Sequence, residues 1–229
     1  MRGCELRYLI HVLFLTSATL AHGDTVSEFV GTWLLDGPGT ESEINLTDEG
    51  QRLRDSYDLL VDDPSLKCIP ASSSRVWANP NAPIKIEVSS ESIQITYELF
   101  DLERVIPFGS GEDLTDTPST SNLKGVYFSE MGSSFARHEE SQILIESRGH
   151  SPGYIRTSRG IPQTSSTIAY ELLTVDNDIL HITHTYVDDM VFEDPLILTY
   201  SLRRADELSI NLYDCVDSDY GWFEDLNSK

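Results

Sequence analysis

Positive charge is scarce in this sequence. The 229 residues include 16 Lys and Arg against 38 Asp and Glu, so the net charge at pH 7 is −22. A surface of this sign repels phosphate backbones and anionic lipid headgroups. The composition therefore argues against a nucleic-acid-binding protein and against one that docks on anionic membranes.

Long apolar runs are also missing, except at the start of the chain. There, two arginines precede an apolar stretch of about 13 residues, which is shorter than the roughly 20 that a membrane-spanning helix needs. Small residues follow, and cleavage after Ala21 or Gly23 fits a secretory signal. We expect residues 1–23 to be a signal peptide rather than a membrane anchor. The protein is then exported, periplasmic or secreted, with no membrane span after signal cleavage.

Cysteine is rare as well, with three residues in the chain. Cys4 leaves with the signal, so the mature chain keeps Cys68 and Cys215. Disulfides persist in exported proteins, which favours a bridge between these two. Two separated thiols are the alternative, because a sequence does not show whether the sulfur atoms can meet.

The usual signatures of enzymes and cofactor sites are absent or incomplete. Neither a Gly-rich phosphate loop nor a Cys-x-x-Cys motif occurs. Residues 132–136 approximate the nucleophile motif Gly-x-Ser-x-Gly, but the last glycine is replaced by Ala136. Residues 217–221 begin a calcium-loop pattern that lacks its closing glutamate. We therefore expect no cofactor and no metal site.

The sequence does contain a series of short strands. Between residues 29 and 213, runs rich in Val, Ile, Thr and Tyr are separated by clusters of Gly, Pro, Asn, Asp and Ser, which is the strand signature. The expected strands are Phe29–Leu35, Arg75–Asn79, Ile84–Val88, Ile93–Leu99, Arg104–Phe108, Ser141–Ser147, Thr167–Val175, Ile179–Val187, Leu196–Leu202 and Leu208–Leu212.

Other segments complete the expected domain. Thr47 can cap one helix over Thr47–Leu60, and residues 109–122 and 148–166 read as long polar loops. We predict a single all-β domain over residues 24–229, with an acidic tail from about residue 216. Its fold is an antiparallel β-barrel of lipocalin-like shape with one short N-terminal helix, and a β-sandwich is the alternative.

A candidate site lies on two of these strands. In Ile179–Val187, Leu180 and Ile182 fix the buried face, and a period of two carries His184 and Tyr186 onto it. A turn over residues 174–178 makes a hairpin, across which we expect Glu171 and His184 to be near neighbours. Tyr97 shares the apolar face of its own strand. We expect these four residues, His184, Tyr186, Glu171 and Tyr97, to line the interior and contact a ligand.

Three functions stay open for this site. A barrel interior commonly houses a ligand, so the chain can bind a small, mostly apolar molecule. It can instead be a cavity enzyme in which His184 and Glu171 act as an acid–base pair. A structural or protein-binding module, in which the pair makes an ordinary hydrogen bond, is the third. The binding module leads because no nucleophile, metal set or cofactor motif supports catalysis.

The charges of Glu98 and Arg104 predict how their two strands pair. A three-residue loop would set Glu98 against Arg104, whereas a two-residue loop would set it against Glu103, a like-charge pair that is disfavoured. We expect the longer loop and a cross-strand pair of Glu98 with Arg104.

Several short motifs are spread along the chain. They are Leu46-Thr47-Asp48-Glu49-Gly50, Tyr57-Asp58, Asp62-Asp63-Pro64, Cys68-Ile69-Pro70, Arg75, Ile95-Thr96-Tyr97-Glu98, Tyr170-Glu171 and Val187-Asp188-Asp189. Together they resemble a family of exported, β-rich bacterial proteins whose members are largely uncharacterised. Ser74 and Met190 stand where that family has proline, and residues 79–83 depart from its usual pattern. The resemblance implies export and a β-rich fold. Separately, Gly31-Thr32-Trp33 is similar to the Gly-x-Trp of lipocalins, whose barrels hold small apolar ligands.

Overall fold

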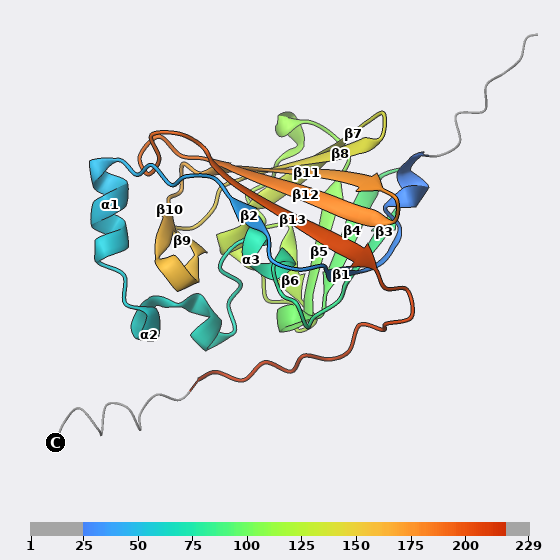
Figure 1. Cartoon of the computed structure of the whole chain (residues 1–229), viewed down its shortest axis with the longest axis horizontal. Helices are drawn as coiled ribbons and strands as arrows, with labels where there is room; N and C mark the ends of the chain where they lie inside the picture. The colour runs from blue at the N-terminus through green and yellow to red at the C-terminus, as the bar shows by residue number, and fades with distance from the viewer. Residues whose placement is uncertain (1–24, 219–229) are drawn as a thin grey trace, which may run out of the picture.

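A computed structural model describes residues 25–218 (Figure 1). The expected signal peptide and the tail beyond residue 218 lie outside the described residues. Within residues 25–218, no helix has the length and apolar character that crossing a membrane requires.

Eleven strands form one antiparallel sheet. They are β1 (Gly31–Leu35), β2 (Thr40–Glu41), β3 (Ile84–Val88), β4 (Ser92–Tyr97), β5 (Leu102–Pro107), β6 (Thr120–Asn122), β7 (Ser133–Glu139), β8 (Gln142–Arg148), β11 (Ile168–Asp176), β12 (Ile179–Val187) and β13 (Leu196–Arg204). Their neighbour order is β6-β5-β4-β3-β1-β13-β12-β11-β8-β7, and β2 pairs with β13 beyond the end of β1. A mostly β, antiparallel fold is thus confirmed.

The remaining elements are short. Two further strands, β9 (Gly153–Arg156) and β10 (Ile161–Gln163), pair with each other. The α-helices are α1 (Asp48–Asp55), α2 (Leu59–Asp62) and α3 (Ser73–Trp77), and the 3-10 helices are η1 (Thr25–Glu28), η2 (Pro64–Lys67), η3 (Leu99–Asp101), η4 (Gly111–Asp113), η5 (Ser129–Met131) and η6 (Thr157–Arg159). In Figure 1, α1, α2 and the β9–β10 hairpin gather at one end of the sheet.

Alternating side chains make the core. In β12 the burial pattern follows the expected period of two, with Leu180, Ile182, His184 and Tyr186 buried. Strands β3–β5 lie behind β11–β13 in Figure 1, and the inward side chains of both groups belong to one hydrophobic cluster. The sheet therefore wraps around a shared core.

The two ends of the strand order also approach each other. Phe108, just after β5, forms a parallel bridge with Ala136 of β7. The Gly109 N–H donates to the Ala136 carbonyl at 3.0 Å, and the Ser119 N–H donates to the Gly132 carbonyl at 3.1 Å. A few backbone bonds thus connect the last strands of the sheet.

Three expectations about secondary structure were wrong. Residues 75–79 contain the end of α3 rather than a strand, because Ser72 caps the helix through the Arg75 N–H (3.2 Å). Leu208–Leu212 is not a strand: Leu212 is 69% exposed, and the segment runs along the outside of the sheet. The helix expected over Thr47–Leu60 is divided into α1 and α2, although Thr47 does cap α1 by accepting from the Gly50 N–H at 3.0 Å.

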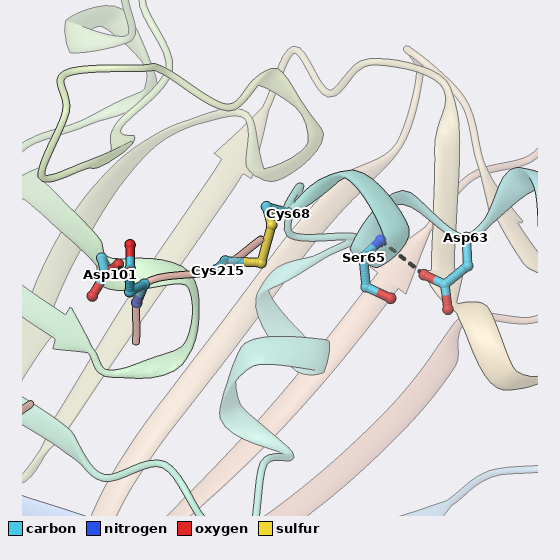
Figure 2. The surroundings of a disulfide bond; sticks show 6 residues. Asp63, Ser65, Cys68, Asp101 and Cys215 are labelled. Carbon is cyan, nitrogen blue, oxygen red and sulfur yellow. Dashed lines mark hydrogen bonds between the residues drawn. A yellow bond between two sulfur atoms is a disulfide. The ribbon is translucent and has the colours of Figure 1, made fainter. Parts of the chain in front are cut away.

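The segment after β13 is held against the sheet by its connections. Cys215 forms a disulfide with Cys68, at the end of η2 (Figure 2). The Asp101 carboxylate accepts from the backbone N–H groups of Tyr213 (2.7 Å) and Asp214 (3.1 Å). The pairing favoured by the cysteine count is therefore present, and it fixes the final described segment beside the α2–α3 region.

Candidate functional site

A cluster of polar side chains lies inside the sheet. We call it the interior polar cluster, and it consists of Trp77, Tyr97, Arg104, Ser134, Ser147, Glu171 and His184. Its centre is an ion pair of 2.7 Å between Arg104 Nη1 on β5 and Glu171 Oε1 on β11, with both side chains fully buried. Because β5 and β11 belong to opposite groups of strands, this pair links the two sides of the core.

Glu171 holds two further partners. Its Oε2 accepts a hydrogen bond from Trp77 Nε1 at 2.9 Å, and His184 Nδ1 lies 3.9 Å away. The hairpin register places Glu171 directly opposite His184, so the two residues are neighbours across the hairpin as expected. Burial is the largest single effect and alone would raise the pKa of Glu171. The Arg104 charge, His184 and the hydrogen bonds from Arg104 and Trp77 together hold the pKa below its usual value. Glu171 is therefore an ionised carboxylate near neutral pH.

His184 is neutral in this environment. Its pKa is lowered to about 4, and burial is the largest cause. The negative charge of Glu171 raises the pKa, and the positive charge of Arg104 lowers it further. The ring lies 6.3 Å from Tyr186 in a stacked arrangement and 5.8 Å from Tyr200 edge-on, measured between centroids. Among the described residues, neither ring nitrogen has a hydrogen-bond partner. A neutral imidazole offers one donor and one acceptor, and buried polar groups normally have hydrogen-bond partners.

Arg104 was assigned the wrong partner from the sequence. Tyr97 pairs with Leu102, so a four-residue connection joins β4 and β5, and Arg104 lies opposite Ile95. That register turns Arg104 inward, while Glu98 stays outside and accepts from the Asn211 N–H at 2.8 Å. The longer connection is possible because Phe100 and Asp101 adopt positive φ angles of 62° and 55°.

The seryl side chains of the cluster support Arg104. Arg104 Nη2 donates to Ser134 Oγ at 3.0 Å and to Ser147 Oγ at 2.9 Å, and the two hydroxyls lie 2.9 Å apart. Ser134 belongs to the incomplete Gly-x-Ser-x-Gly segment, yet it lies within strand β7 rather than on a strand-to-helix turn. It is thus a buried partner of an arginine, and it does not contact His184.

The other two expected site residues also face inward. Tyr97 is fully buried, and its ring meets the edge of Trp77 at 5.4 Å. The Tyr186 hydroxyl accepts a hydrogen bond from the Ser74 N–H at 3.1 Å and lies 3.2 Å from Ser73 Oγ. All four expected residues are therefore interior, and Tyr186 and Trp77 fix α3 against the core. Their contact with a ligand stays a prediction.

A pocket of about 560 Å³ opens at the end of the sheet near α2 and α3. We call it the end pocket; its lining residues are Leu35, Pro38, Gly39, Thr40, Glu41, Leu59, Asp63, Arg75, Ala78, Arg156, Thr157, Ser158 and Tyr200. Gly39 lies so close to β13 that a Cβ there would be 2.4 Å from the Thr199 carbonyl oxygen. Only glycine therefore permits this approach of the chain to the pocket wall.

Tyr200 connects the end pocket with the interior polar cluster. It lines the pocket, is 6% exposed, and packs edge-on against the buried His184 ring. Ala78 lines the same pocket directly after Trp77, which donates to Glu171. No sequence motif indicated this pocket, because its walls come from segments far apart in the chain. One of them is residues 148–166, which were expected to be a polar loop but contain β9, η6 and β10.

Comparisons with known proteins find similar chains among solved structures alone. No protein-family model matches the chain, and no curated protein matches it. Among solved structures, the wild type of the fluorescent protein UnaG is similar over 79% of this chain and 99% of its own, with 13% identity and a TM-score of 0.37. A point mutant of UnaG is similar over 79% and 98%, with 12% identity and a TM-score of 0.39.

Proposed function

We propose that this exported protein is a β-barrel that binds a small, mostly apolar molecule in the end pocket. The observation that carries the proposal is that one residue, Tyr200, belongs to the wall of the end pocket and also contacts the interior polar cluster. A pocket of about 560 Å³ has the size of small-molecule sites. Its buried wall, Tyr200, packs on His184, whose ring nitrogens lack protein partners within residues 25–218. An apolar ligand with one polar group would fit this combination.

The closure of the barrel is part of this proposal. The Phe108–Ala136 bridge and the backbone bonds beside it lie where β5 and β7 must meet if the sheet closes. A closed sheet leaves its ends as the openings to the interior, and the end pocket lies at one such end. Trp33, of the Gly31-Thr32-Trp33 motif, is fully buried, and Arg204 of the last strand stacks over its ring at 4.3 Å.

The cavity-enzyme alternative has weaker support. A general base must be able to take a proton from a substrate, but the Glu171 carboxylate is already engaged by Arg104 and Trp77. His184 is a weak base because its pKa is lowered to about 4. No serine or threonine of the described part of the chain donates to this imidazole. The geometry therefore favours binding over acid–base chemistry.

A fluorescent apolar dye tests the proposed function. The mature chain is titrated with the neutral dye N-phenyl-1-naphthylamine, whose emission rises in apolar surroundings, and saturable binding of one dye per chain is expected. Ser158 is an exposed residue that lines the end pocket, so Ser158→Trp should obstruct it and weaken dye binding. Ser165 is equally exposed and lies outside the pocket lining, so Ser165→Trp is the matched control.

Two results would reject the end pocket as a binding site. One is an emission that rises without saturation, as it does for dye on a loosely packed surface. The other is equal binding by the Ser158→Trp and Ser165→Trp variants, both checked for the native melting temperature.

A further inference from the structure

One arginine of the end pocket has no ionic partner among residues 25–218. Arg75, in α3, is half-buried and lines the pocket, and no carboxylate of residues 25–218 forms an ion pair with it. The neighbouring acid, Glu41, is already paired with Arg156 at 2.8 Å and with Arg159. The other acid of the lining, Asp63, accepts from the Ser65 N–H at 2.9 Å (Figure 2). In a chain of net charge −22, an unpaired and half-buried cation is unusual.

A buried hydroxyl shares the pocket with this cation. Tyr200 is 94% buried, and its hydroxyl makes no hydrogen bond within the described part of the chain. Burial is the main cause that raises the pKa of this phenol, against the positive charges of Arg156 and Arg75. The phenol is therefore protonated at neutral pH and able to donate. A charged guanidinium and a phenolic O–H that face one pocket without protein acceptors are donors for an oxyanion.

Apart from Arg75, Asp63 and the ion pair of Glu41 with Arg156, the lining is apolar or neutral. Leu35, Leu59 and Ala78 supply hydrocarbon surface, and Leu59 is 48% exposed at the pocket rim. The two acids in the lining and the strongly negative chain disfavour a ligand with more than one negative charge. A single carboxylate on an apolar body matches these walls.

We propose that the ligand of the end pocket is an amphipathic carboxylate, whose anionic group binds Arg75 and Tyr200 while its apolar part lies against Leu35, Leu59 and Ala78. This inference rests on the proposed function and adds the chemical class of the ligand. Arg75 acts as the specificity-determining residue, because its planar guanidinium matches a carboxylate with two parallel hydrogen bonds. Tyr200 supplies a third bond from β13.

The test compares two ligands of equal chain length and different charge. Sodium dodecanoate and 1-dodecanol each compete with N-phenyl-1-naphthylamine for the native mature chain, below their micelle or solubility limits. Dodecanoate should bind more tightly than the alcohol. Arg75→Gln should weaken dodecanoate by about tenfold or more, as expected for the loss of a hydrogen bond to a charged group, and leave the alcohol nearly unchanged.

Three further variants make the result specific. Arg75→Lys keeps the charge without the planar donors, so it should fall between the native protein and Arg75→Gln. Tyr200→Phe keeps the ring on His184 and should weaken dodecanoate severalfold. Arg203→Gln removes the same charge from an exposed position outside the pocket, so it should change neither ligand.

The possible failures are distinguishable. The carboxylate site is overturned if the native protein binds dodecanoate and dodecanol equally tightly, or if Arg75→Gln weakens the binding of both equally. In either case, saturable dye binding would still support the proposed function. The site is also overturned if Arg203→Gln weakens dodecanoate binding as much as Arg75→Gln does. Such a result would show that net charge acting at long range, and not a contact with Arg75, sets the affinity. Failure of the native protein to bind the dye at all removes both proposals.

Discussion

Replacing Glu171 by Gln tests whether the buried ion pair organises the interior. The substitution removes the charge that neutralises Arg104, while the amide oxygen can still accept from Trp77 Nε1. Arg104 is fully buried and keeps neutral partners, among them the hydroxyls of Ser134 and Ser147. Breaking a buried pair by removing one partner typically costs about 3 to 5 kcal/mol, so Glu171→Gln should lower the free energy of unfolding by this amount.

The assay is urea unfolding at pH 7, followed by tryptophan fluorescence. A matched control is Glu87→Gln, which removes a carboxylate from the half-exposed pair of Lys85 and Glu87 (3.0 Å) and should cost less than about 1 kcal/mol. Combining Glu171→Gln with Arg104→Met should cost less than the sum of the single changes, because no unpaired charge remains. A loss for Glu171→Gln no larger than for the control would refute the assignment of this pair as a buried, mutually dependent unit.

The buried histidines and the disulfide also have measurable effects on stability. Burial lowers the pKa values of His184 and His150 to about 4, whereas the unfolded chain titrates near 6.5, so the unfolded state binds more protons between these values. Stability should therefore decline as the pH falls from 6.5 to 4, by about 3 kcal/mol for each histidine, and His184→Phe should remove roughly half of that decline in urea titrations at several pH values; an unchanged slope would contradict a buried, neutral His184. The Cys68–Cys215 disulfide closes 147 residues, so Cys215→Ser should destabilise by about 5 kcal/mol in the chain-entropy description. Peptide mapping without reductant that finds both thiols unreacted would exclude the bridge.

The face of a strand was predictable where apolar residues fix it. Leu180 and Ile182 determine which side of β12 is buried, and the same period carries His184 inward. The pairing with Glu171 was predictable because Asn177 and Asp178 tolerate the positive φ angles of a tight turn, 51° and 60°. Alternation and turn chemistry are local properties, so the sequence displays them.

The partners of Arg104 were not predictable in this way. The strand face on which Arg104 lies depends on the length of the β4–β5 connection, and the charge of Glu98 led to a wrong prediction of that length. The groups that accept from or pair with Arg104 belong to β7, β8 and β11, which are distant in sequence. In β7, Ser133 and Ser134 are buried next to Phe135 and Ala136, so no apolar alternation marks the strand.

Helix α3 was missed for a related reason. Val76 and Trp77 are consecutive and both buried, which a short helix permits and a strand with one buried face does not. The segment has only five helical residues, too few for a helical period to be recognised. As a result, the sequence did not place Arg75 at the end pocket, where the helix presents it.

A crystal structure of the mature protein with dodecanoate tests the central claim most directly. The account predicts the carboxylate within hydrogen-bond distance of both the Arg75 guanidinium and the Tyr200 hydroxyl, with the alkyl chain against Leu59 and Ala78 in the end pocket. Dodecanoate bound elsewhere, or in the end pocket with its carboxylate directed into solvent away from Arg75, would contradict it.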